Sequence, residues 1–171
     1  MHKAESVKKM CLTGIFAALV FLMTAYIFHI PIGVSGGYLH FGDAFIYLAA
    51  SMLPTPYAMA AGAIGAGLSD ALSPGGIVWL IPTVIIKSLL CLGFSSREPR
   101  ILHKRNLLAL ILACLITLVG YYIAGAIITG NWAAGLVEIP VSLVQSAGSG
   151  AGYLIFGYAL DKMGFKAKAA L

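Results

Sequence analysis

Residues 106–129 read NLLALILACLITLVGYYIAGAIIT, an apolar stretch without a charged side chain. A transmembrane α-helix needs roughly 20 apolar residues to cross a hydrocarbon core about 30 Å thick. The stretch follows His103-Lys104-Arg105, and cations of this kind collect at the ends of membrane helices. We therefore predict that residues 106–129 form a membrane-spanning helix.

The rest of the chain has the same character. Hydrophobic residues make up 60% of the 171 residues, charged residues only 10%, and the mean hydropathy is +0.95. This composition excludes a soluble domain and leaves room only for short loops. The predicted fold class is all-α, an integral membrane bundle of six transmembrane helices in a single domain, 1–171. The predicted helices are residues 8–28, 42–53, 57–72, 77–94, 106–129 and 137–160.

The basic residues indicate how the bundle is oriented. All but one of the 11 Lys and Arg residues lie before or at the start of the first predicted helix, between the fourth and fifth, or after the sixth. With six helices these segments share one side, which the positive-inside rule makes cytoplasmic, so both termini are predicted in the cytoplasm. We expect a multi-pass protein of the bacterial plasma membrane. The first helix is too long for a signal peptide and lacks a small-x-small cleavage site, so we expect it to be retained.

Four ionisable residues fall within or at the ends of predicted helices, away from the cytoplasmic fringe. The acids Asp43, Asp70 and Glu138 lie at outer helix ends in this topology, and Lys87 is the one base. A buried charge in a membrane costs several kcal/mol unless it is paired or hydrated. One acid alone would be a helix cap or a solvent-exposed group, whereas three at one mouth favour a binding site. Lys87 either reaches the cytoplasmic surface or pairs with an acid.

Polar residues recur with helical spacing around these charges. A stripe at i, i+4, i+7 and i+11 must face the bundle interior. The loop before Asp43 is rich in glycine and carries Tyr and His, which is typical of a flexible cover over a ligand. The polar stripes are Glu138, Ser142, Gln145 and Ser149, and Trp79, Thr83 and Lys87. On the third predicted helix, Gly62, Ala66 and Asp70 share a face that permits close helix approach and ends in a carboxylate. The loop residues are Gly33, Gly36, Gly37, Tyr38, His40 and Phe41.

Tryptophans and acids together predict a pocket for a flat, donor-rich or cationic small molecule. Trp79 and Trp132 would contribute to it, although interfacial tryptophans also form membrane belts. Nothing predicts a metal or another cofactor: Cys11, Cys91 and Cys114 lie in predicted helices without ligand spacing, and we expect no disulfide. No nucleotide-binding motif is present, so we expect no ATPase activity and no enzyme.

Several of these residues carry a resemblance to a known family. The chain resembles the substrate-binding S components of energy-coupling factor (ECF) vitamin transporters, in particular the riboflavin-type branch. The resemblance covers nearly the whole chain in length, helix layout and loop order. Its motifs are Gly37-Tyr38-Leu39-His40-Phe41-Gly42-Asp43-Ala44, Ser69-Asp70, Trp79, Pro82-Thr83 and Ile85-Ile86-Lys87.

The resemblance implies a protein that captures a vitamin from outside, under the first loop. It would act with a transmembrane T component and two cytoplasmic ATPases, and would topple in the membrane to release the vitamin inside. In that family a small-xxx-small pattern on the first helix docks onto the T component. Thr13 with Ala17, and Gly14 with Ala18, match that pattern here, although small residues serve packing within one protein equally well.

Two other classes remain open on the sequence. An ion-coupled carrier or intramembrane enzyme would use His40, Asp43, Asp70 and Lys87. A structural membrane subunit would bind no ligand. If the protein is an S component, the outer loops without Lys or Arg disfavour a phosphorylated ligand. Three acids favour a protonated or amine-bearing heterocycle, and we predict a pyridoxine-type vitamin or hydroxymethylpyrimidine, ahead of riboflavin or a queuosine precursor.

Overall fold

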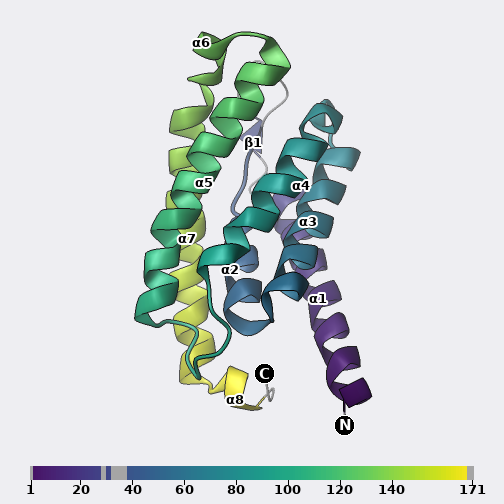
Figure 1. Cartoon of the computed structure of the whole chain (residues 1–171), viewed down its shortest axis with the longest axis vertical. Helices are drawn as coiled ribbons and strands as arrows, with labels where there is room; N and C mark the ends of the chain where they lie inside the picture. Colours follow the sequence, from purple (N-terminus) through teal and green to yellow (C-terminus); the bar gives the residue numbers. More distant parts are fainter. Residues whose placement is uncertain (1, 28–29, 32–37, 169–171) are drawn as a thin grey trace.

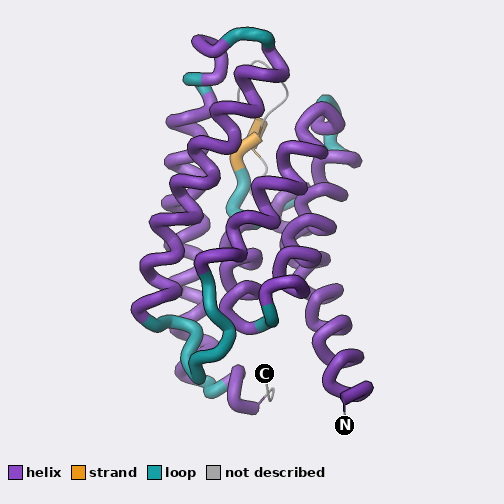
Figure 2. The backbone as a smooth tube through the Cα atoms, in the orientation of Figure 1, coloured by secondary structure: helices purple, strands orange, loops and turns teal. Residues whose placement is uncertain are grey.

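The computed structural model describes residues 2–27, 30–31 and 38–168, and most of these are helical (Figures 1 and 2). Each of the six predicted segments is helical over most of its length. The fourth is an α-helix flanked by short 3-10 turns, η1 (Gly76–Trp79) and η2 (Leu90–Gly93). The α-helices are α1 (His2–Ala25), α2 (Asp43–Met52), α3 (Thr55–Leu72), α4 (Leu80–Leu89), α5 (Lys104–Thr129), α6 (Trp132–Gly135), α7 (Glu138–Lys162) and α8 (Phe165–Lys168).

The helices pack side by side in one bundle (Figure 1). The pairs α1–α3, α3–α4 and α5–α7 lie in contact, and α2 packs against both α3 and α7. The first turn of α1 and the short helix α8 lie at the same end of the bundle, which we call the α8 end; the opposite one, with α6 and η1, is the α6 end (Figure 1). Helix α2 therefore sits between two groups of longer helices.

Two short helices lie where the sequence predicted loop or tail. Gly130, with a φ of 65°, ends α5, because glycine adopts this left-handed conformation readily. The side-chain oxygen of Asn131 then accepts a hydrogen bond from the backbone N–H of Ala133 at 2.9 Å and caps α6. The prediction of an irregular loop over residues 130–136 was therefore wrong for four of them, Trp132–Gly135.

Three helical segments are long and apolar enough to cross a membrane by length and composition: Lys3–Ala25, Gly76–Gly93 and Lys104–Thr129. Helix α2 is apolar but has only 10 residues, which corresponds to a length of about 15 Å. The helical fold and these spans make the chain a membrane protein. The six-span count and the cytoplasmic termini stay predictions.

The outer surface of the bundle is apolar and its interior holds polar groups. Ile81, Leu108 and Ile155 are 72%, 66% and 67% exposed, as expected of side chains that face lipid. In a membrane the hydrophobic effect does not drive helices together, so close helix contact depends on small residues that let the backbones approach. A Cβ atom on Gly65 would lie 2.5 Å from the carbonyl oxygen of Ala17, so α1 and α3 touch along their backbones.

The loop between α1 and α2 contains two short antiparallel strands. Strand β1 (Ile30–Pro31) pairs with β2 (Tyr38–Leu39), and Ile30 lies opposite Leu39. The loop ends in a tight contact with α7, because a Cβ atom on Gly148 would lie 2.0 Å from the Phe41 ring. The sequence did not predict these strands, which are too short to give an alternating pattern.

Hydrogen bonds fasten the loop between η2 and α5 at the α8 end. The Asn106 side chain accepts from the backbone N–H of Ser95 at 2.7 Å and donates to the backbone oxygen of Ile101 at 3.0 Å. The Asp161 carboxylate accepts from the backbone N–H of Ile101 at 2.7 Å. Lys166 of α8 donates to the backbone oxygen of Ser51 at 2.9 Å. These bonds join the loop to α5 and α7, and α8 to α2.

Candidate functional site

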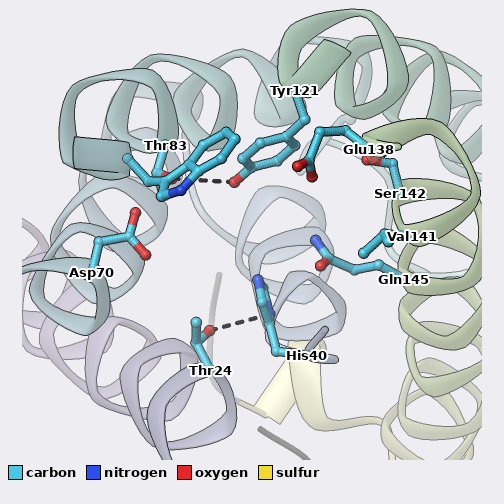
Figure 3. A pocket seen from close by; sticks show the side chains of 10 residues that line it. Thr24, His40, Asp70, Thr83, Tyr121, Glu138, Val141, Ser142 and Gln145 are labelled. Carbon is cyan, nitrogen blue, oxygen red and sulfur yellow. Dashed lines mark hydrogen bonds between the residues drawn. The ribbon is translucent and has the colours of Figure 1, made fainter. Parts of the chain in front are cut away.

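A cavity with a volume of about 40 Å³ lies toward the α6 end (Figure 3). Residues of α1, α3, η1, α4, α5 and α7 line it, together with His40 from the loop before α2. The lining residues are Thr24, His40, Asp70, Trp79, Thr83, Tyr121, Glu138, Val141, Ser142 and Gln145.

Two carboxylates lie on opposite walls of the cavity. Figure 3 shows Asp70 of α3 on one side and Glu138 of α7 on the other, with open space between them. The Asp70 side chain is 3% exposed, whereas Glu138 is half-buried. None of the described residues that line the cavity is Lys or Arg. When ionised, the two acids only accept hydrogen bonds, so this wall composition favours a ligand with donors or positive charge.

Aromatic groups form a third wall. The Trp79 and Tyr121 rings lie 5.9 Å apart between centroids, at an angle of 49°. The Tyr121 hydroxyl and the Thr83 hydroxyl are hydrogen-bonded at 3.2 Å (Figure 3). Trp79 is the last residue of η1, and Thr83 follows one helical turn later on α4. Both side chains line the cavity, as their spacing predicted. The pair of rings offers a surface on which a flat ligand can stack.

His40 closes the cavity from the side of the first loop. Its Nδ1 accepts a hydrogen bond from the backbone N–H of Gly42 at 3.1 Å and lies 3.4 Å from the Thr24 hydroxyl (Figure 3). In the neutral ring the proton therefore sits on Nε2. A Cβ atom on Gly42 would lie 2.1 Å from the Thr24 hydroxyl, so this contact needs a glycine. The tight fit holds the imidazole at the edge of the cavity.

Directly behind the cavity wall lies a buried ion pair. The Lys87 Nζ is 2.8 Å from Oδ1 and 2.9 Å from Oδ2 of Asp43, and both side chains are 0% exposed. Two cavity residues rest against this pair. The Gln145 Nε2 donates to Asp43 Oδ2 at 3.0 Å, and the Lys87 ammonium lies 5.1 Å from the centroid of the Tyr121 ring.

The position of Asp43 differs from the prediction of three acids at one mouth. Asp43 does begin the second helix, as predicted. Helix α2, however, spans only about 15 Å, roughly half of a hydrocarbon core, so its first residue lies deep in the bundle. Of the two readings of Lys87, the structure shows pairing with an acid and not an extended side chain at the surface. Neither Asp43 nor Lys87 lines the cavity.

Other predicted site residues lie in different places. Trp132 is 61% exposed, outside the cavity, and its ring packs 5.9 Å from that of Tyr122. The predicted stripe on α7 does face inward: Ser142, Gln145 and Ser149 are buried, and the first two line the cavity. The side chain of Tyr38 lies outside the part of the chain that the structure describes, as do Gly33, Gly36 and Gly37.

Sequence reasoning missed three residues that line the cavity, Thr24, Tyr121 and Val141. Tyr121 and its neighbour Tyr122 interrupt an aliphatic helix, which was a usable signal for a polar contact inside the bundle. Thr24 near the end of α1 was a weaker signal, because a hydroxyl in a membrane helix often bonds only to its own backbone. Val141 gave none.

The four small residues on α1 divide into two faces. Ala17 is 7% exposed against α3, and Thr13 is half-buried, with its hydroxyl bonded to the backbone oxygen of Lys9 at 2.8 Å. Gly14 and Ala18 are exposed, and a Cβ atom on Gly14 would meet nothing within 4 Å. The pair Thr13 and Ala17 thus packs inside the protein, while Gly14 and Ala18 offer a smooth outer strip.

The cysteines form no disulfide: Cys11, Cys91 and Cys114 are all free. Among the described residues, no group of three or more His, Cys, Asp or Glu side chains gathers in a way that could hold a metal ion.

Most of the chain matches a known protein family. Residues 4–162 match the family model of the ECF-type riboflavin transporter S component. The chain belongs to this family. It is also similar to a Pyrococcus woesei protein described as "Uncharacterized protein in gap 3'region". The two are 29% identical over 140 residues, which cover 78% of this chain and 92% of that protein.

Membership among the S components makes the chain a substrate-binding subunit of an ECF-type transporter. It implies a small-molecule substrate of the vitamin type, and T-component and ATPase partners in general. The family is a class of transporter subunit and not a class of enzyme.

Proposed function

We propose that the protein captures a pyridoxine-type vitamin or hydroxymethylpyrimidine in the cavity and delivers it inward with a T component and two cytoplasmic ATPases. The observation that carries the proposal is the cavity wall, in which two acids face each other across a pair of aromatic rings. Both ligands are flat nitrogen heterocycles that can be protonated and that carry hydrogen-bond donors.

In this proposal, the ring of the ligand stacks on Trp79 and Tyr121. Asp70 and Glu138 accept from its donors or pair with its protonated nitrogen, while His40, Thr83, Ser142 and Gln145 complete the polar contacts. The sequence alone also predicted contacts from Asp43 and Lys87; here these two act one layer behind the wall. Trp132 and Tyr38 carry no part of the proposal.

We further propose that the chain forms a single membrane domain with six membrane crossings and both termini in the cytoplasm. The clustering of basic residues on one side of six helical segments supports this orientation. The first turn of α1 and the helix α8 share one end of the bundle, as an even number of crossings requires (Figure 1). Gly14 and Ala18 are the proposed docking strip for the T component.

The experiment is native mass spectrometry of the protein purified in detergent from its own host, to detect a copurifying small molecule. Thermal shift across a panel of vitamins and precursors follows, with riboflavin and a queuosine precursor included. We expect a heterocycle with an amino or hydroxymethyl group to bind and to raise the unfolding temperature. A protein that is empty after purification and shifts with no member of the panel would contradict the proposal.

A further inference from the structure

Gln145 connects the cavity to the buried ion pair. Its side chain lines the cavity and is 4% exposed, and Figure 3 shows it extending toward His40. Its Nε2 donates to Asp43 Oδ2 at 3.0 Å on the other side. One amide therefore touches the ligand space and a buried charge at the same time.

The chemistry of the ion pair dictates which end of the amide faces it. An ammonium group within 2.9 Å of both oxygens keeps Asp43 ionised, and a carboxylate can only accept hydrogen bonds. The amide nitrogen of Gln145 is a donor and satisfies that acceptor. The reversed amide would place the carbonyl oxygen against the buried negative charge of Asp43, so it is strongly disfavoured.

This orientation leaves the Gln145 carbonyl oxygen for the cavity. Within the described part of the chain, the one hydrogen bond of the Gln145 side chain is the bond to Asp43. Its carbonyl oxygen is not fully enclosed by protein atoms. The oxygen is thus an acceptor with access to the cavity.

We propose that the Asp43–Lys87 pair orients the amide of Gln145 so that its carbonyl oxygen selects ligands that present an N–H or O–H donor at this wall. The inference rests on the proposed function for the identity of the ligand class. Asp43 and Lys87 are positioning residues in this account, and Gln145 is the residue that contacts the ligand. A ligand with a carbonyl group at the same place would put its own oxygen against the carbonyl oxygen of Gln145, and neither atom could donate a hydrogen bond.

The first test uses two matched probes on the purified protein. One is hydroxymethylpyrimidine with its exocyclic amino group, and the other is the corresponding pyrimidinone, with a carbonyl in place of that group. We expect the amino probe to bind roughly tenfold or more tightly, because a site built for a donor leaves its acceptor unpaired with the wrong ligand. The same measurement on the charge-neutral variant Asp43→Asn/Lys87→Met, whose amide is free to turn, should bring the ratio of the two Kd values close to one.

Ser142→Ala is the matched control, because it alters the cavity wall on the same helix without touching the ion pair. It should change both affinities together and keep their ratio. A double variant that retains the wild-type ratio would overturn the inference, since the ratio is insensitive to a general loss of folded protein.

A second test needs no ligand. Gln145→Glu places a carboxylate beside Asp43, whereas Gln145→Met places a neutral group of similar length there. At mildly alkaline pH we expect Gln145→Glu to unfold several degrees below Gln145→Met, and the difference to vanish in the Asp43→Asn/Lys87→Met background. Equal unfolding temperatures would overturn the orientation. If neither probe binds, the ligand class of the proposed function fails, and the unfolding comparison still decides the orientation.

Discussion

Lys87 and Asp43 form a fully buried ion pair, with Nζ 2.8 Å from Oδ1. The two residues are 44 positions apart in the sequence and belong to different helices. The pair joins α4 to the beginning of α2 and supports two cavity residues from behind. Both charges are buried, so the removal of either residue would leave the other charge without its counterion.

The first prediction concerns this mutual dependence. Lys87→Met alone should lower the free energy of unfolding by about 3–5 kcal/mol, because it leaves the Asp43 carboxylate buried without its cation. Asp43→Asn/Lys87→Met should regain most of that loss. Thermal unfolding in detergent measures both. A single variant as stable as the double variant would show that the pair contributes no coupling.

The second prediction concerns the two acids of the cavity. Asp70→Asn and Glu138→Gln should each weaken binding of a protonated or amine-bearing heterocycle by roughly tenfold or more, since a hydrogen bond to a charged group is worth about 1.5–3 kcal/mol. Isothermal titration of the purified protein gives the Kd values. Glu98→Gln is the control, because Glu98 lies exposed in the loop before α5, away from the cavity. Unchanged affinity in both cavity variants would remove these acids from the site.

The third prediction concerns the end of the first loop. Gly148→Ala should cost about 1–3 kcal/mol, because the added Cβ would lie 2.0 Å from Cε1 of Phe41 and the ring would have to shift. Gly150→Ala on the same helix is the control: its Cβ would meet nothing within 4 Å. It should be neutral or slightly stabilising.

Thermal unfolding and ligand affinity report the effect of Gly148→Ala. Adding Phe41→Leu, which shortens the ring side chain, should restore part of the lost stability. The steric explanation is wrong if Gly148→Ala and Gly150→Ala behave alike.

The fourth prediction separates partner docking from folding on α1. Gly14→Leu should abolish copurification with the T component and ATPases and leave ligand affinity unchanged, because the Gly14 surface contacts nothing inside the protein. Ala17→Leu should instead destabilise the protein, since Ala17 is buried where α1 and α3 meet. Pull-down of the complex and a ligand titration distinguish the two. A Gly14→Leu protein that still assembles would place the docking strip elsewhere.

The sequence predicted the helices well because apolar runs in a membrane protein have few alternative structures. Pro54 and the Ser73-Pro74 turn marked both ends of α3 within two residues. It did not reveal the capped turn at Asn131 or the two-residue strands, because hydrogen bonds local to a few residues leave little periodic signal.

Much of the candidate site was also predictable, since the spacing of Ser142 and Gln145 on α7, and of Trp79 and Thr83 around α4, placed them on inward faces. The depth of Asp43 was not. It depends on how far along the bundle a ten-residue helix begins, and that is set by its neighbours and not by its own sequence. The pairing of Asp43 with Lys87 followed from that depth and was only one of two readings beforehand.

The segment before α2 contributes His40 to the cavity wall, whereas α2 itself contributes no residue. The longer helices α1, α3, α5 and α7 each place at least one residue in that wall. A change in the ligand that the protein binds is therefore expected through substitutions on these four helices, on η1 and α4, and at His40, and not through substitutions on α2.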